Sequence, residues 1–135
     1  MLSDEIKNEA EKAGVKYEDY FENDAYVLKN AFITSQGALK LLLDNANAYI
    51  AGKRVLITGF GRIGKSLAGM LKGLGMKVFI AARGESARAE AADCGYEVFT
   101  FSQLSATLFY YDYIFNTVPE RIFTERDIRH IRNDT

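Results

Sequence analysis

With 135 residues, the chain is long enough for one compact domain with a hydrophobic core but too short for two. Hydrophobic residues make up 48% and charged residues 26%, which is typical of a globular protein and excludes a disordered or fibrous one. The formal net charge of -1 gives no general attraction to nucleic acid, and no apolar stretch approaches the length of a membrane span. We therefore expect neither nucleic acid nor a membrane as a partner.

Two features of the sequence bear on location. The acidic start from Met1 to Glu5 has the wrong charge for a signal peptide. Cys94 is the single cysteine, so the chain cannot form an internal disulfide and a reducing compartment is expected. Cys94 precedes Gly95 at the end of an expected helix, where we expect it to pack as a small hydrophobic residue. The predicted location is the cytoplasm.

The first quarter of the chain is expected to be helical and irregular. Ser3 can cap a short helix that ends at Gly14, and a polar, aromatic stretch follows over residues 17–30. We predict that residues 1–33 form a helical and irregular remnant of a substrate domain.

A second helix is expected over residues 34–48, where apolar residues recur at helical spacing. Thr34 is its candidate N-cap. This helix leads directly into the region that carries the main motif. We therefore predict a partial dinucleotide-binding domain over residues 34–135.

From Lys53 onward, short apolar runs alternate with stretches of helical spacing. The expected strands cover residues 54–58, 77–82, 96–100 and 112–117. The expected helices begin near Ile63, Ser86, Ser102 and Thr124. Strands and helices that alternate at these lengths form right-handed βαβ units. The predicted fold is therefore α/β, a truncated Rossmann-like doubly wound parallel sheet with strand order 3-2-1-4, preceded by N-terminal helices.

A glycine motif lies between the first of these strands and the helix after it. Its residues are Gly59, Phe60, Gly61, Arg62, Ile63 and Gly64. In this context Gly59 permits a tight turn, Gly61 lets the backbone approach a pyrophosphate, and Gly64 lets the helix pack closely on the strand. The free amides and the dipole of the helix favour phosphate at the same point. The alternative is a close-packed turn that binds no ligand.

The end of the second expected strand selects between cofactors. A carboxylate there would hold the ribose 2′-hydroxyl of NAD, whereas an arginine accommodates the 2′-phosphate of NADP. This sequence has Ala82-Arg83, and Arg83, Ser86 and Arg88 can offer donors. We predict NADP, while Glu85 leaves NAD open. The alternative for both arginines is simple surface solvation.

The fourth expected strand ends in Asn116-Thr117-Val118-Pro119, at the carboxyl edge of the sheet where ligands of doubly wound folds bind. Asn116 and Thr117 can line the cofactor crevice there. The alternative is a strand-to-loop cap in which Pro119 ends the ladder.

A group for proton transfer is harder to identify. His130 is the single histidine, and the expected helix that carries it is exposed. The acidic residues Glu18, Asp19, Glu22 and Asp24 lack metal-ligand spacing. We therefore predict no metal site and assign no catalytic residue.

Several segments together resemble the NAD(P)-binding subunit of dipicolinate synthase over residues 26–120. They are Asn30-Ala31-Phe32, residues 34–38, residues 52–55, the glycine motif, Leu74-Gly75, Ala82-Arg83 and residues 116–119. That family is similar to the D-2-hydroxyacid and alanine dehydrogenases, with a substrate domain before an NAD(P)-binding domain. The resemblance implies an oxidoreductase subunit that supports formation of dipicolinate from a dihydrodipicolinate-type precursor during sporulation.

The resemblance also implies partners and site residues. It implies that Gly59, Gly61 and Gly64 hold a pyrophosphate, that an adenosine ribose lies beside Arg83, and that the partner is a flavoprotein-like B subunit. The sequence departs from the family in lacking most of the substrate domain and the later strands, and in Gln36, where an acid is common. We expect this chain to bind the dinucleotide without turnover, and its open sheet edge to drive association with a second copy.

Other classes of protein use the same kind of motif. The main alternative is a regulatory nucleotide-sensing Rossmann module, in which binding shifts an oligomer without catalysis. Such modules, like methyltransferases, usually carry an acid after the second strand, and Ala82-Arg83 counts against both. A purely structural interaction module is a further alternative.

Overall fold

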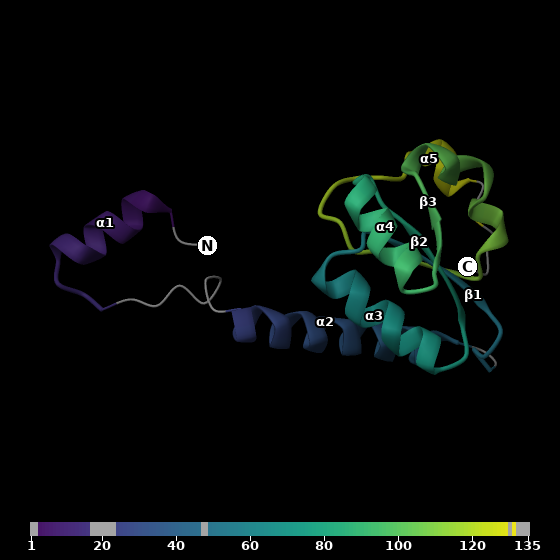
Figure 1. Cartoon of the computed structure of the whole chain (residues 1–135), viewed down its shortest axis with the longest axis horizontal. Coiled ribbons are helices and arrows are strands. Elements are labelled where there is room, and N and C mark those ends of the chain that lie inside the picture. The colour runs from purple at the N-terminus through teal and green to yellow at the C-terminus, as the bar shows by residue number, and fades with distance from the viewer. Residues whose placement is uncertain (1–2, 17–23, 47–48, 130, 132–135) are drawn as a thin grey trace.

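A computed structural model describes residues 3–16, 24–46, 49–129 and 131 of the chain. Its centre is a four-stranded parallel sheet in the order β3-β2-β1-β4 (Figure 1). The strands are β1 (Arg54–Thr58), β2 (Lys77–Ala81), β3 (Glu97–Phe99) and β4 (Tyr113–Asn116). The strand order confirms the predicted Rossmann-like α/β fold.

Helices and short 3₁₀ turns connect and flank these strands. The α-helices are α1 (Asp4–Lys12), α2 (Asp24–Asn45), α3 (Arg62–Gly73), α4 (Glu85–Asp93) and α5 (Glu125–Ile128). The 3₁₀ turns are η1 (Phe101–Ala106) and η2 (Leu108–Tyr110). None of the helices in the described segments is both long enough and apolar enough to cross a bilayer.

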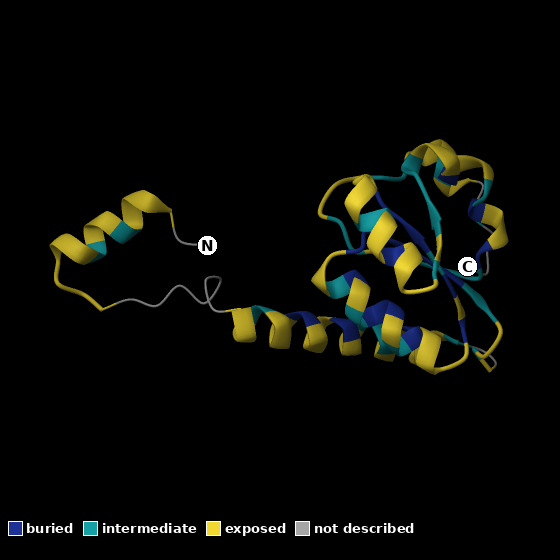
Figure 2. Cartoon of the chain, viewed as in Figure 1, coloured by how far each residue is buried: buried dark blue, intermediate teal, exposed yellow. Residues whose placement is uncertain are grey.

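Hydrophobic clusters cover both faces of the sheet, because successive side chains of β1 point to opposite sides. Val55 and Ile57 pack on one face with Leu67 of α3. Leu56 points to the other face and packs with Leu104 of η1. Figure 2 shows buried positions along β1 and β2, whereas α1 and much of α2 are exposed. The sheet is therefore sandwiched, as expected for a doubly wound fold.

The long helix α2 differs from the prediction at its start. It begins at Asp24 rather than at Thr34, whose hydroxyl donates within the helix to the carbonyl oxygen of Asn30. No proline interrupts this stretch, and Ala31 and Ser35 are buried one helical turn apart. The helix is therefore continuous, and the proposed division of the chain after residue 33 falls inside it. Its predicted end at residue 48 lies outside the described residues.

Three other local predictions were wrong. Gly84, not Ser86, is the N-cap of α4. Residues 101–106 form a 3₁₀ turn capped by Thr100, where an α-helix capped by Ser102 was expected, because the Thr107 amide bonds to the Leu104 carbonyl in the tighter 3₁₀ pattern. Cys94 is exposed at the C-cap of α4 rather than packed.

Two predicted caps are confirmed. Ser3 caps α1 by accepting from the amide of Ile6. Thr124 caps α5 in a reciprocal capping box with Asp127.

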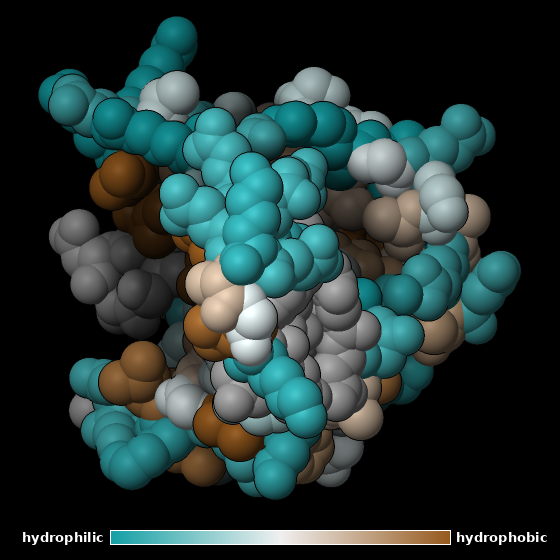
Figure 3. Space-filling view, turned by 90° about the vertical axis from the view of Figure 1, so that its left-hand side faces the viewer, coloured by the Kyte–Doolittle hydropathy of each residue, from teal (hydrophilic) through white to brown (hydrophobic). Residues whose placement is uncertain are grey.

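On the face shown in Figure 3, hydrophobic side chains occur in separate patches among hydrophilic ones.

Candidate functional site

The turn between β1 and α3 requires glycine at its first position. Gly59 has a φ of +95°, a conformation that other residues rarely adopt. A Cβ atom here would lie 2.7 Å from Cγ1 of Val118 and 2.8 Å from Oγ1 of Thr117. The Gly59 amide also donates to the carbonyl oxygen of Ala81 at 2.7 Å. Gly59 therefore ties the ends of β1, β2 and β4 together.

Gly64 is required for a different reason. It is buried in the first turn of α3, and an added Cβ would clash with the carbonyl oxygen of Gly59. That obstacle is backbone, which cannot rotate away as a flexible side chain can. Gly64 thus lets α3 pack directly on the turn that precedes it, as the motif predicts.

Gly61 differs from both, because a Cβ built on it would meet no atom of the described chain within 4 Å apart from its two neighbours in sequence. It is exposed and serves as the N-cap of α3, with no side-chain capping bond. The first intrahelical bond starts from the amide of Lys65, which donates to the carbonyl oxygen of Gly61 at 2.9 Å. The helix N-terminus beside Gly61 is therefore open to a ligand, and its amides and dipole fit an anionic group such as a pyrophosphate.

Two open pockets meet at this glycine. The first, here called the β2-side pocket, has a volume of about 340 Å³, and its lining includes Gly61, Ala82, Arg83 and Glu120. The second, the α2-side pocket, has a volume of about 250 Å³, and its lining includes Asn30, Gly61 and Thr117. A ligand that crosses Gly61 can extend into both pockets, which is the geometry that an elongated dinucleotide requires.

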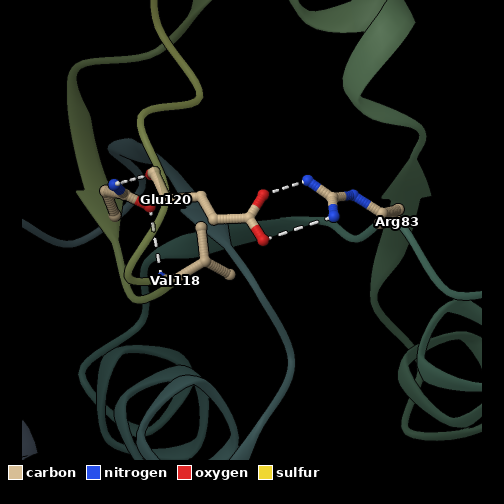
Figure 4. Close-up of polar contacts among 4 residues, drawn as sticks. Arg83, Val118 and Glu120 are labelled. Carbon is tan, nitrogen blue, oxygen red and sulfur yellow. Dashed lines mark hydrogen bonds and ion pairs between the residues drawn. The ribbon is translucent and has the colours of Figure 1, made fainter.

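Arg83 lies at the mouth of the β2-side pocket and faces Glu120 (Figure 4). Nη1 of Arg83 donates to Oε1 of Glu120 at 3.4 Å, and Nη2 pairs with Oε2. The hydrogen bond and the charge of Glu120 raise the pKa of Arg83, which stays positively charged. The guanidinium carbon also lies 6.0 Å from the ring centre of Phe101.

The end of β4 is held by side chains that sequence reasoning placed in the crevice. Oδ1 of Asn116 accepts from the hydroxyl of Thr58 at 2.8 Å and from the amide of Val118 at 3.2 Å, while Nδ2 donates to the carbonyl oxygen of Glu120 at 3.4 Å. The hydroxyl of Thr117 donates to the carbonyl oxygen of Thr58 at 2.9 Å. These bonds correspond to the strand-to-loop cap that was the alternative interpretation.

The cap brings its neighbours to the site. Val118 and Pro119 line the β2-side pocket together with Glu120, and Thr117 lines the α2-side pocket. Asn116 and Thr117 therefore position the loop through their polar groups, and this loop forms the wall of the cleft opposite Arg83.

The other predicted residues of the glycine motif have different surroundings. Phe60 is buried and packs edge-on against Tyr96, with ring centres 5.8 Å apart. Arg62 is exposed, and its Nη2 lies 3.8 Å from Oδ1 of Asp24. The carbonyl oxygen of Ile63 accepts from the hydroxyl of Ser35 at 3.2 Å.

After β2, the predicted residues separate into those at the pocket and those beside it. Ala82 is buried and lines the β2-side pocket with Arg83. Ser86 is exposed on α4 and does not line that pocket. Nη1 of Arg88 donates to the carbonyl oxygens of Ala82 at 2.8 Å and Arg83 at 2.5 Å. Arg88 therefore fixes the backbone that presents Arg83.

Sequence reasoning missed two residues of the site. Ser35 is fully buried and joins α2 to the first turn of α3, since its hydroxyl contacts the carbonyl oxygens of Ala31 and Ile63. The sequence signal that could have identified Ser35 is its position one helical turn after Ala31, on the apolar side of the expected helix. Glu120 carried no local signal, because its partner Arg83 is 37 positions away in the chain.

Most of the residues considered for proton transfer and metal binding fall outside the part of the chain that the structure describes. His130, Glu18, Asp19 and Glu22 lie outside the described residues. Asp24 is exposed and contacts Arg62. Within the described ranges, no group of histidine, cysteine, aspartate and glutamate side chains is arranged to hold a metal ion.

The parallel sheet, the glycine turn and the open N-terminus of α3 define the class of nucleotide-binding Rossmann domains. Within this class, the profile of the family described as D-isomer specific 2-hydroxyacid dehydrogenase, NAD binding domain, matches residues 30–132. The chain belongs to this family of NAD-binding domains.

Individual relatives match different parts of the chain. Adenosylhomocysteinase of Saccharolobus solfataricus is 32% identical over 99 residues, which cover 70% of this chain and 24% of that protein. Adenosylhomocysteinase of Thermoplasma volcanium is 36% identical over 74 residues, covering 52% of this chain and 18% of that protein. The chain therefore spans a quarter or less of these curated relatives.

Among solved structures, a dipicolinate synthase chain from Bacillus subtilis is similar to the whole chain, with a TM-score of 0.85 and 25% identity. The match covers 100% of this chain and 45% of that one. The corresponding dipicolinate synthase chain from Bacillus halodurans gives the same TM-score and identity and is covered to 46%. The sequence relatives and the structural relatives thus carry different names but share the Rossmann domain.

Proposed function

We propose that this chain is the cofactor-binding part of an oxidoreductase subunit of the dipicolinate synthase type, and that it binds NADP(H) or NAD(H) across Gly61. The observation that carries the proposal is the contrast among the three motif glycines. Packing within the chain requires Gly59 and Gly64, whereas the space beside Gly61 is open and joins two pockets at a helix N-terminus. A turn that served packing alone would not need glycine at this position.

Each part of the dinucleotide has a proposed place. The amides at the start of α3, from Arg62 to Gly64, would hold the pyrophosphate. The β2-side pocket, with Ala82 and Arg83, would take the adenosine, and the α2-side pocket would take the nicotinamide end. When bound, a nicotinamide cofactor supplies hydride transfer.

We favour NADP over NAD because of the residues after β2. Arg83 lines the pocket with its guanidinium exposed, and β2 ends in Ala81 without a carboxylate at its tip. An arginine at this position can accommodate the 2′-phosphate that distinguishes NADP.

Coverage supports the dipicolinate synthase type over an adenosylhomocysteinase type. The structural match to dipicolinate synthase covers the whole of this chain, including α1 and α2, whereas sequence matches to adenosylhomocysteinases cover 52% to 74% of it. The sequence similarity keeps the adenosylhomocysteinase type as a second candidate. For both candidates, the reaction catalysed by the whole protein is a proposal.

We expect binding without turnover by this chain alone. Among the described residues, Glu120 is the one acid that lines either pocket, and it is paired with Arg83. A regulatory nucleotide-sensing module would also bind the dinucleotide but would not take part in hydride transfer. Binding measurements alone do not distinguish this alternative from the oxidoreductase subunit.

Partners and location follow from the same proposal. β4 pairs with β1 on one side only and forms an edge of the described sheet, so a second copy of this chain can associate there. A flavoprotein-like B subunit is the partner that the resemblance to dipicolinate synthase implies. The single cysteine fits a reducing compartment, and we propose that the protein acts in the cytoplasm.

The proposal is tested by calorimetric titration of the chain and its Gly61→Val variant with NADP and NAD. Valine would fill the open space beside the helix N-terminus, so we expect binding to be lost while the melting temperature stays within a few degrees. Gly69→Val is the matched control, because Gly69 is exposed on the same helix and an added Cβ would meet no atom within 4 Å outside its chain neighbours and the backbone of that helix. Unchanged affinity in Gly61→Val, or no binding by the parent chain, would contradict the proposal.

A further inference from the structure

An ion pair crosses the pocket that is proposed to take the adenosine. Arg83 follows β2 and Glu120 follows β4, so the pair joins two loops on either side of the end of β1 (Figure 4). Each terminal nitrogen of the guanidinium donates to a different carboxylate oxygen, which is the bidentate arrangement. The Arg83 guanidinium, which is proposed to lie beside the ribose, is therefore already paired with the Glu120 carboxylate.

The backbone at both ends of this pair is anchored. Arg88 donates to the carbonyl oxygen of Arg83, and Asn116 donates to the carbonyl oxygen of Glu120. The same Asn116 side chain accepts from the amide of Val118 and so holds the turn between them. These anchors involve neither the Arg83 guanidinium nor the Glu120 carboxylate. The Glu120 carboxylate can therefore leave Arg83 while the loop that carries it stays in place.

We propose that Glu120 is a specificity-determining residue that competes with the cofactor 2′-phosphate for Arg83; this inference rests on the proposed function. A 2′-phosphate must displace the Glu120 carboxylate from the guanidinium before it can pair with Arg83. The 2′-hydroxyl of NAD carries no charge and leaves the ion pair intact. Glu120 therefore lowers the affinity for NADP relative to NAD. This effect opposes that of Arg83, which favours NADP.

The exposure of the pair sets the size of this effect. The Arg83 and Glu120 side chains are 70% and 60% exposed, so solvent weakens their attraction. The competition adjusts the preference without excluding NADP. Removing the carboxylate charge should tighten NADP binding by about two- to fivefold, the range expected for an exposed ion pair.

The experiment measures dissociation constants for NADP and NAD with the parent chain, Glu120→Gln, Arg83→Ala and the double variant. NADP and NAD differ only in the 2′-phosphate, so their ratio isolates that group. Glu120→Gln should shift the ratio toward NADP by about two- to fivefold. In the Arg83→Ala background the same substitution should have no effect, because the residue acts through Arg83. Glu125→Gln, the same charge change outside both pockets, should leave the ratio unaltered.

Several outcomes would overturn the inference. They are an unchanged ratio in Glu120→Gln, an equal shift in Glu125→Gln, and a shift that persists without Arg83. If the parent chain binds NADP or NAD and the ratio does not respond, the inference alone fails. If the parent chain binds neither nucleotide, the proposed function fails and this inference fails with it.

Discussion

The three glycines of the turn after β1 illustrate how one residue type serves separate purposes. Gly59 is needed for its positive φ, Gly64 for the approach of α3 to the carbonyl of Gly59, and Gly61 for no contact within the described chain. The motif alone predicts glycine at all of these positions but does not distinguish packing from binding. The distinction comes from the atoms that a Cβ would meet.

At the residue scale, we predict that Gly64→Ala lowers the free energy of unfolding by about 1–3 kcal/mol, because the added methyl must displace backbone in a packed turn. Urea denaturation measures the change. Gly69→Ala on the exposed side of the same helix should instead stabilise by about 0.4–1 kcal/mol, since it meets no atom and restricts the unfolded chain. Equal effects of the two substitutions would show that Gly64 is not held against Gly59.

At the element scale, the site depends on how α2 and α3 meet. The buried hydroxyl of Ser35 in α2 contacts the carbonyl oxygen of Ile63, in the first turn of α3. This contact joins a helix at the N-terminal end of the domain to the helix whose amides face the open space. The α2–α3 pair therefore supports the glycine turn through the first turn of α3.

We predict that Ser35→Ala lowers the free energy of unfolding by about 0.5–1.5 kcal/mol, the usual worth of one hydrogen bond. The exposed neighbour Thr34 is the control, because within the described residues its hydroxyl donates to the carbonyl oxygen of Asn30 in its own helix. Thr34→Ala should be neutral or stabilising, since alanine favours helix more than threonine does. Chemical denaturation of both variants compares them, and a Ser35→Ala variant as stable as the parent would show that this contact does not hold the helices together.

The regular elements near the site were predictable because their signals are local. The strand from Arg54 to Thr58 is a short apolar run, and the helix after it has apolar residues at intervals of three and four. The start of α2 was not predictable from the sequence. Thr34 has the residue type of an N-cap, but the helix begins earlier, at Asp24, and Ala31 before Thr34 is buried. Local pattern carries no information on such burial.

The glycine turn and Arg83 were predictable as candidates, but the pairing of Arg83 was not. Glu120 directly follows Pro119, and nothing in its immediate sequence pairs it with Arg83. Only the sheet order, which sets β2 and β4 on either side of β1, brings Glu120 to Arg83. Contacts between loops at different strand ends depend on topology rather than on spacing.

At the scale of the whole molecule, the sheet brings the ends of β1, β2 and β4 to one edge, with the N-terminus of α3 beside them. This edge is where ligands of doubly wound folds bind. A third pocket, of about 500 Å³, lies along β4 and the C-terminal half of α2, away from the glycine turn. We place the dinucleotide at the glycine turn and not in this third pocket.

The most direct test of that placement is a map of backbone amide chemical-shift changes as NADP is added to the isotopically labelled chain. We predict that the largest changes fall on the amides of residues 61–64 and 82–84, where the pyrophosphate and the ribose would bind. Changes concentrated on residues 113–116 and on the C-terminal half of α2, or no changes at saturating NADP, would contradict this placement.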